Sequence, residues 1–164
     1  MIRITPDYDE SLFKKRIAMF KKRLCMAIEL ELSYLGEELA NYAKENHNYI
    51  DRSGNLTNSI GYYIIKDGKI LKGKTVTPIR GLEKEDYNPK KASDRAKSVA
   101  KEFADQITHS YALIVVAGME YASYIEAKGY NVILPAQFMC MKEFPKRMEN
   151  LRNKVKERIN NDRF

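Results

Sequence analysis

Residues 60–73 read IGYYIIKDGKILKG, which places two β-prone runs on either side of Asp67-Gly68. A type I′ turn needs positive φ at both of its central residues, and an Asp-Gly pair accepts this conformation readily. The stretch therefore predicts a β-hairpin. A hairpin also makes antiparallel pairing the starting point for the rest of the sheet.

A long amphipathic helix is predicted before the hairpin, over about residues 11–46. Its apolar residues recur at steps of three and four, which is the period of one helix face. They are Phe13, Ile17, Phe20, Leu24, Ile28, Leu32, Leu35, Leu39 and Tyr42. Gly36 lies inside this pattern at a cost of about 1 kcal/mol relative to alanine. We therefore expect a bend or a close packing contact at Gly36.

The chain after the hairpin alternates between helical and strand-like patterns. Residues 81–91 are charged and indicate a loop, and the apolar spacing of residues 92–107 indicates a helix. Residues 111–118, YALIVVAG, form a β-branched apolar run that we expect to be the most buried strand. A short helix over residues 120–128 follows, and Gly129 is expected to end it in the left-handed conformation.

The last third of the chain completes the predicted fold. Residues 131–134 are a candidate return to the sheet, which Pro135 would break. Pro145 suits the first turn of a final amphipathic helix with a basic outer face. Together the elements predict an α/β protein of the α+β type. It has a mainly antiparallel β-sheet, with a long N-terminal helix, a short helix after the central strand and a C-terminal helix packed on it.

Length and composition are those of one soluble globular domain over residues 1–164. Apolar residues make up 44% of the chain and charged residues 31%, which is ordinary for that class. No apolar run approaches the ~20 residues that a membrane span needs, and residues 1–9 lack the regions of a signal peptide. We expect a cytoplasmic protein.

The sequence contains little that indicates catalysis. His47 and His109 lie in different predicted elements and in no HExxH or GxSxG motif. Cys25 and Cys140 have no CxxC spacing and are expected to be buried free thiols. A phosphate-binding GxxxxGK[ST] loop is also missing from the sequence. We expect no enzyme activity, no metal and no cofactor.

The net charge of +7 and the pI near 9.3 raise the question of an acidic partner. The basic triplets Lys14-Lys15-Arg16 and Lys21-Lys22-Arg23 are seven residues apart, or about two helical turns, and on that spacing share a helix face. A second basic group lies in the C-terminal segment: Lys142, Lys146, Arg147, Arg152, Lys154, Lys156 and Arg158. Two interpretations remain open, a solvated helix face or an electrostatic footprint for an acidic protein or for DNA phosphates.

Two further features concern turns and tyrosines. Ser53-Gly54-Asn55 is a turn signal, and we expect positive φ at Gly54. Tyr121 and Tyr124 lie in the predicted short helix, with Tyr130 just beyond it. Because tyrosine has an apolar body and a polar tip, these residues fit either a half-buried core edge or a protein–protein interface.

The stretches 51–60, DRSGNLTNSI, and 121–130, YASYIEAKGY, resemble the tail-completion or head-tail joining proteins of long-tailed bacteriophages. Members of that family carry a small-Gly-x-Leu-x-x-Ser-Ile element after the first helix, and then a Tyr-Ala-x-Tyr-(Val/Ile)-Glu segment that ends at a glycine. The matching residues are Gly54, Leu56, Ser59, Ile60, Tyr121, Ala122, Tyr124, Ile125, Glu126 and Gly129. Compared with the family, the chain has one more residue between Glu126 and Gly129, and about residues 81–106 look like a helical insertion.

The resemblance implies a structural phage or prophage protein that joins head and tail by forming a homo-oligomeric ring. The ring would lie at the virion neck after assembly in the host cytoplasm, and genome DNA would pass through its lumen. Its implied partners are further copies of itself, a head-completion or connector protein, and a tail-tube or tail-terminator protein, without a membrane.

We expect contacts between copies from the hairpin at Asp67 and Gly68 and from Tyr124 and Tyr130. The alternative is a basic nucleic-acid-binding protein that uses residues 14–23 and the C-terminal helix.

Overall fold

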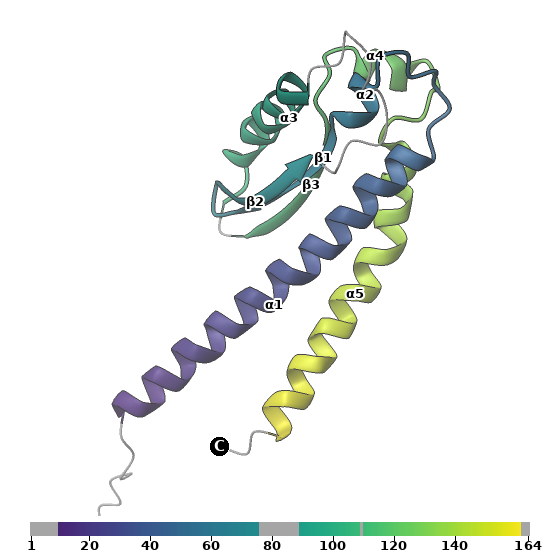
Figure 1. Ribbon diagram of the computed structural model, residues 1–164. Helices are drawn as coiled ribbons and strands as arrows, with labels where there is room; N and C mark the ends of the chain where they lie inside the picture. Colours follow the sequence, from purple (N-terminus) through teal and green to yellow (C-terminus); the bar gives the residue numbers. More distant parts are fainter. Residues whose placement is uncertain (1–9, 76–88, 109, 162–164) are drawn as a thin grey trace, which may run out of the picture.

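The computed structural model describes residues 10–75, 89–108 and 110–161. Its elements are α1 (Glu10–Glu45), α2 (Asn55–Asn58), β1 (Ile60–Lys66), β2 (Lys69–Thr75), α3 (Pro89–Ala104), β3 (Tyr111–Ala117), α4 (Ala122–Ala127) and α5 (Leu134–Asn161). The three strands form one antiparallel sheet in the order β2-β1-β3. Helices cover both faces of this sheet (Figure 1). The predicted α+β class is confirmed.

The predicted hairpin is also present, with φ of 50° at Asp67 and 77° at Gly68. Both central residues therefore have the positive φ that the Asp-Gly pair predicts. The pairing of β1 with β2 shifts register between Ile64 and Ile65, whereas β1 pairs with β3 without a shift.

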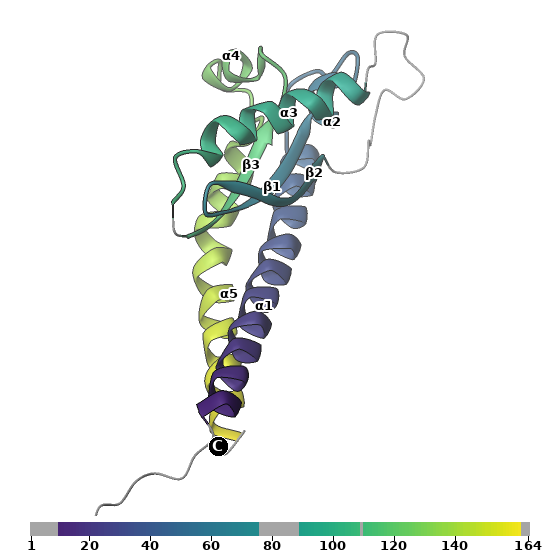
Figure 2. The ribbon, with the colours of Figure 1, turned by 90° about the vertical axis from the view of Figure 1, so that its left-hand side faces the viewer.

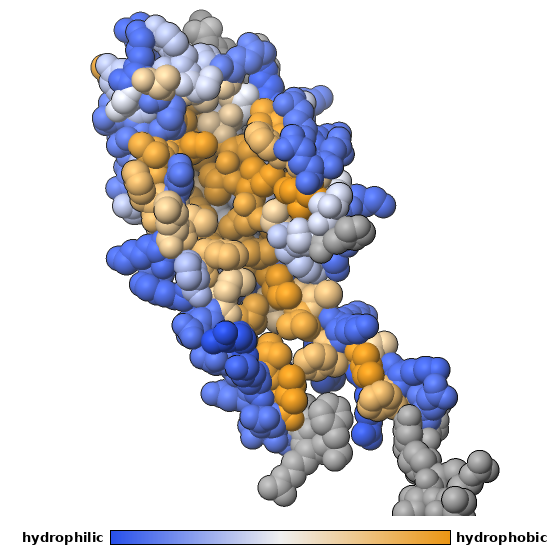
Figure 3. Space-filling model, turned by 180° about the vertical axis from the view of Figure 1, so that it is seen from behind, coloured by the Kyte–Doolittle hydropathy of each residue, from blue (hydrophilic) through white to orange (hydrophobic). Residues whose placement is uncertain are grey.

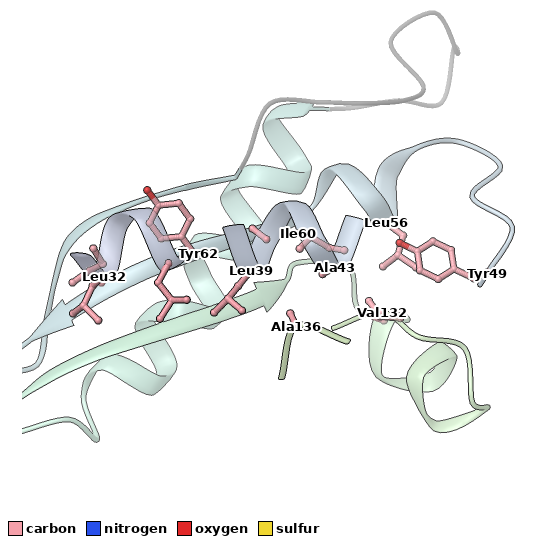
Figure 4. Close-up of a cluster of buried hydrophobic side chains, with 13 residues drawn as sticks. Leu32, Leu39, Ala43, Tyr49, Leu56, Ile60, Tyr62, Val132 and Ala136 are labelled. Carbon is pink, nitrogen blue, oxygen red and sulfur yellow. The ribbon is translucent and has the colours of Figure 1, made fainter. Parts of the chain in front are cut away.

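The larger hydrophobic core lies between the C-terminal half of α1 and one face of the sheet. Leu35 and Leu39 are fully buried there with Ile60 and Ile64, and Figure 4 shows part of this cluster. Gly36 allows the close approach, because a Cβ at this position would lie 2.7 Å from Tyr62 Cγ. Of the two expectations for Gly36, close packing is the one that the structure bears out.

A second, smaller core lies on the other face of the sheet, under α3. Ala96 and Ala100 have no exposed surface and pack with Tyr63 and Val116. Their small side chains let the helix lie close to the sheet, and a Cβ on Gly118 would be 2.6 Å from the Ala96 nitrogen. The helix predicted within the 81–106 segment therefore forms one layer of the fold, while residues 81–88 lie outside the described residues.

The prediction that residues 111–118 are the most buried strand is wrong. Every residue of β1 from Ile60 to Ile65 is buried, whereas in β3 only Val116 is. The reason is topological, since β1 has a strand on each side and β3 lies at the edge of the sheet. Residues 131–134 do not return to the sheet, and within the described residues no fourth strand covers that edge.

The C-terminal helix begins earlier than the two prolines indicate. Pro135 lies in the first turn of α5, and Pro145 lies in its interior. A proline inside a helix removes one backbone hydrogen bond, and the packing of α5 along α1 supplies the stability that this bond would add. The two helices lie side by side and antiparallel (Figure 2). Arg147 joins them through bonds of 3.2 Å to Glu31 and 2.5 Å to Glu38.

Among the helices of the described residues, none combines the length and the apolar character that a membrane crossing requires.

Candidate functional site

The first of the two matching stretches folds as a tight turn that leads into the sheet. Gly54 has φ of 80°, as predicted. The Asp51 carboxylate accepts the Gly54 N–H at 2.9 Å and the Thr57 N–H at 3.1 Å. These bonds satisfy donors at the start of α2, which have no partner within the helix. Leu56 and Ser59 are buried directly after the turn.

The second stretch folds as α4 followed by a left-handed stop. Gly129 has φ of 82°, and the Gly129 N–H bonds to the Glu126 carbonyl while the Tyr130 N–H bonds to the Ile125 carbonyl. This pair of bonds is the Schellman motif that ends many helices. The Glu126 carboxylate then holds the next segment, because its Oε2 accepts the N–H groups of Val132 at 3.1 Å and Ile133 at 2.8 Å.

The fold brings the two stretches together at one end of the sheet. The Gly118 N–H donates to the Ser59 carbonyl at 3.2 Å and to Ser59 Oγ at 3.1 Å. The Asn131 N–H donates to Asn48 Oδ1 at 2.6 Å. Leu56 packs in the same core as Ala122, Ile125 and Val132. Most of the matching residues thus form turns or pack in the core. In doing so they fix the position of the exposed residues of the same two stretches.

The tyrosines of the second stretch lie outside that core. Tyr124 is 61% exposed and Tyr130 45% exposed, and Tyr121 is exposed as well. Lys128 lies over the Tyr124 ring, with 4.5 Å between its Nζ and the ring centroid. By contrast Tyr62 and Tyr63 of β1 are buried. The tyrosines of the second stretch are therefore not core residues, and an interface role for them stays a prediction.

The two segments expected to supply contacts between copies lie at opposite ends of the sheet. Asp67 and Gly68 follow the last residue of β1, whereas the tyrosines lie beyond Ile60, at its start. The seven residues of β1 separate these ends by roughly 20 Å. The structure therefore does not combine the hairpin tip and the tyrosines into one surface.

The six basic residues of the two α1 triplets are all exposed. Members of a triplet are 100° apart around the helix, so Lys14 aligns with Lys21, Lys15 with Lys22 and Arg16 with Arg23 in three separate rows. They extend around the helix instead of forming one face. Lys14 forms an ion pair with Glu10 at 2.7 Å. The antiparallel packing of α5 places its basic C-terminal part along the same end of the molecule (Figure 2).

A groove along the outer edge of β3 is the feature that the sequence did not predict. It has a volume of about 770 Å³ and lies between Val99 and Phe103 of α3 on one side and Ser123, Glu126 and Ile133 on the other. Figure 3 shows apolar side chains gathered in a band on this side of the molecule. The sequence offers one signal for this groove, which is the small number of predicted strands. In a sheet of few strands an apolar strand often lies at an edge, where one of its sides is uncovered.

Glu126 contributes an unusual group to this groove. Its Oε2 atom accepts hydrogen bonds from two backbone N–H groups, but its Oε1 atom is buried and has no hydrogen-bond partner among the residues that the structure describes. A buried acceptor without a donor is costly. Because this atom has no exposed surface, a donor brought by an occupant of the groove would reach it only after the carboxylate turns.

The histidines and cysteines singled out in the sequence do not come together with other potential metal ligands in the part of the chain that the structure describes. The described residues hold no cluster of three or more His, Cys, Asp or Glu side chains that could bind a metal ion. The His47 ring stacks on Tyr49 with 4.1 Å between centroids. His109 lies outside the described residues. Cys25 and Cys140 are free, as expected, but half-buried instead of buried.

Comparisons of this chain with protein-family models, with curated proteins and with solved structures gave no match.

Proposed function

We propose that the protein is a structural component of a phage or prophage particle that joins head and tail by forming a homo-oligomeric ring at the neck. The observation that carries this proposal is the way the two stretches resembling tail-completion proteins are used. Their buried residues hold one end of the sheet together, and this end presents Tyr121, Tyr124 and Tyr130 to solvent. Exposed tyrosines on a rigid support suit a protein–protein contact.

The positions of the two expected contact segments support a ring over a closed pair. The hairpin tip and the tyrosines are different surfaces at opposite ends of one sheet. When one surface of a copy meets a different surface of the next copy, the contact is head-to-tail, and such contacts form a ring if the rotation closes. The protein acts by shape in this proposal, and its ring would surround the passing genome.

Ring formation is tested by sedimentation velocity and negative-stain electron microscopy of the purified chain, alone and with neck partners encoded beside it. The double variant Tyr124→Glu with Tyr130→Glu should lose the assembly while its thermal unfolding is nearly unchanged. Tyr34→Glu is the matched control, because Tyr34 is 57% exposed on α1, away from the tyrosine-bearing end. Normal assembly of the double variant, or equal loss in the control, would contradict the proposed contact.

The same variants can be tested in the particle. In cells that produce the phage, the double variant should leave filled heads and tails unjoined, and the Tyr34→Glu variant should join them. Neighbouring genes for portal, capsid and tail-tube proteins would support the same assignment, and genes of an unrelated pathway would oppose it.

One observation favours nucleic-acid binding as a second candidate function. The basic N-terminal part of α1 and the basic C-terminal part of α5, far apart in the sequence, lie at the same end of the helix pair. Phosphate contacts alone give weak duplex binding that falls by orders of magnitude between 50 and 200 mM salt. Such weak binding is compatible with a ring through which DNA passes. Fluorescence anisotropy with a duplex measures this. Sequence-specific binding that persists at 200 mM salt would favour the second candidate over the first.

A further inference from the structure

The outer edge of β3 carries backbone N–H and C=O groups that are not paired with any other strand of the described residues. The Gly118 N–H bonds to the Ser59 carbonyl, and the Asp67 N–H bonds to the Ser110 carbonyl. These bonds mark the even-numbered residues of β3 as the ones that exchange hydrogen bonds with β1, because bonding alternates along an antiparallel pair. The N–H and C=O groups of the odd-numbered residues therefore point away from the sheet. These residues are Tyr111, Leu113, Val115 and Ala117.

The other edge of the same sheet looks protected. The β1–β2 register shifts at Ile64/Ile65, and β2 carries Lys69, Lys72 and Lys74. Bulges and edge lysines are devices that prevent strand addition. The β3 strand has neither, since its register with β1 is unbroken and it contains no charged residue. One edge is thus closed to strand addition while the other is open to it.

The groove along β3 defines the chemistry of its occupant. An extended backbone is needed to pair with the open edge. Val99 and Phe103 require apolar side chains at alternate positions on one face of that strand. On the other face, the Glu126 Oε1 atom requires a hydrogen-bond donor, and a cationic one matches its charge.

We propose that this groove takes residues 2–5 of a second copy of the chain as an added β-strand. These residues read Ile2-Arg3-Ile4-Thr5, and Pro6 follows. The two isoleucines share one face of a strand and match the apolar wall, and Arg3 on the opposite face is the donor for Glu126. Proline has no N–H and would end the added ladder.

The donor is a second copy because the chain's own segment is too short. Tyr111, at the start of β3, bonds to Glu29 of α1 at 2.9 Å. The nineteen residue-to-residue steps from Glu10 to Glu29 make roughly 28 Å of helix, while residues 6–9 span at most about 14 Å. This exchange of N-terminal strands between copies rests on the proposed function, because a ring brings residues 2–5 of one copy close to β3 of its neighbour.

Self-association of the full-length chain tests the exchange. Ile4→Asp and Arg3→Glu should each weaken association at least tenfold in sedimentation equilibrium, whereas Ile50→Asp should not. Ile50 is a matched control because it is 87% exposed and lies outside the groove. A synthetic peptide of residues 1–9 should compete with association, and its Arg3→Glu form should not. Equal behaviour of the Ile4→Asp and Ile50→Asp variants would overturn the proposal.

The rates of amide hydrogen exchange along β3 measure the strand addition directly. In the dilute chain the amides of Leu113 and Val115 should exchange fast and those of Ile114 and Val116 slowly, and assembly should protect the fast pair. Val115→Pro should abolish association but leave the β1–β3 ladder in place, because the Val115 N–H points outward. Rings that form without protection of Leu113 and Val115 would overturn the strand exchange and leave the proposed function standing. Protection in a dimer that never closes into a ring would support the exchange and count against the proposed function.

Discussion

The two halves of α1 have the same apolar periodicity but different surroundings. In the C-terminal half Leu32, Leu35 and Leu39 are buried against the sheet, whereas in the N-terminal half Leu12 and Phe13 are about half exposed. Of the described elements, only α5 lies alongside the N-terminal half, in an arm that extends away from the sheet (Figures 1 and 2). A helical period therefore predicts a helix without saying whether its apolar face is covered within one chain.

The largest difference between the halves should appear when a leucine is truncated in each. Leu39→Ala should lower the free energy of unfolding by about 2–5 kcal/mol, because it opens a cavity in the core. Leu12→Ala should lower it by less than about 0.5 kcal/mol, because Leu12 is 53% exposed and Leu39 only 1%. Urea unfolding of both variants at low protein concentration measures these losses. Equal losses would mean that the arm is as well packed as the sheet end.

A substitution that adds a side chain where the core has no room should also distinguish the two halves of α1, with a smaller effect. Gly36→Ala should destabilise the fold by about 1–3 kcal/mol, since its Cβ would lie 2.7 Å from Tyr62 Cγ and 2.9 Å from Leu113 Cδ1. Helix propensity alone would give a gain of about 1 kcal/mol, so the sign decides whether the helix touches the sheet in solution. Ala18→Gly in the arm is the control and should cost only the propensity difference. A stabilised Gly36→Ala variant would contradict the packing.

Local signals in the sequence predicted local structure well. The period of residues 11–46, the Asp67-Gly68 turn and the positive φ at Gly54 and Gly129 all depend on neighbours in the chain. Position within the sheet depends on distant partners, so an apolar run such as 111–118 suggests the most buried strand although it lies at the edge of the sheet. The same dependence on distant partners concealed the groove. Pro145 was misplaced because packing of α5 on α1 overrides a local breaker.

The pH dependence of stability tests the C-terminal end of α1. Burial lowers the pKa of the Lys44 ammonium from 10.5 to about 8. Between pH 8 and 10.5 the unfolded chain keeps a proton that the folded chain has lost, so stability should rise with pH in this window and stay constant with respect to Lys44 below it. The rise from pH 7.5 to 9.5 should be about 1–2 kcal/mol.

Comparing the pH dependence of stability of the parent chain with that of the Lys44→Met variant isolates the contribution of Lys44. Burial raises the pKa of the Cys140 thiol, which acts in the opposite direction but equally in both proteins. Burial also raises the pKa of the Tyr111 phenol to about 12, so its effect begins above pH 10 and outside the measured range. The variant should lack the rise seen in the parent chain. Parallel pH profiles would show that Lys44 is solvated in solution.

The smallest expected effect concerns backbone conformation at the tyrosine-bearing end. Gly129 has φ of 82°, and a Cβ there would meet no atom within 4 Å. Gly129→Ala therefore carries only the cost of the left-handed conformation, about 1 kcal/mol, and Gly129→Asn should cost less because asparagine tolerates it. Thermal unfolding ranks the two. The same backbone positions Tyr130, so a measurable loss of assembly in Gly129→Ala, with stability falling by only this amount, would tie the glycine to the contact surface. If alanine and asparagine are equally costly, the left-handed stop of α4 does not persist in solution.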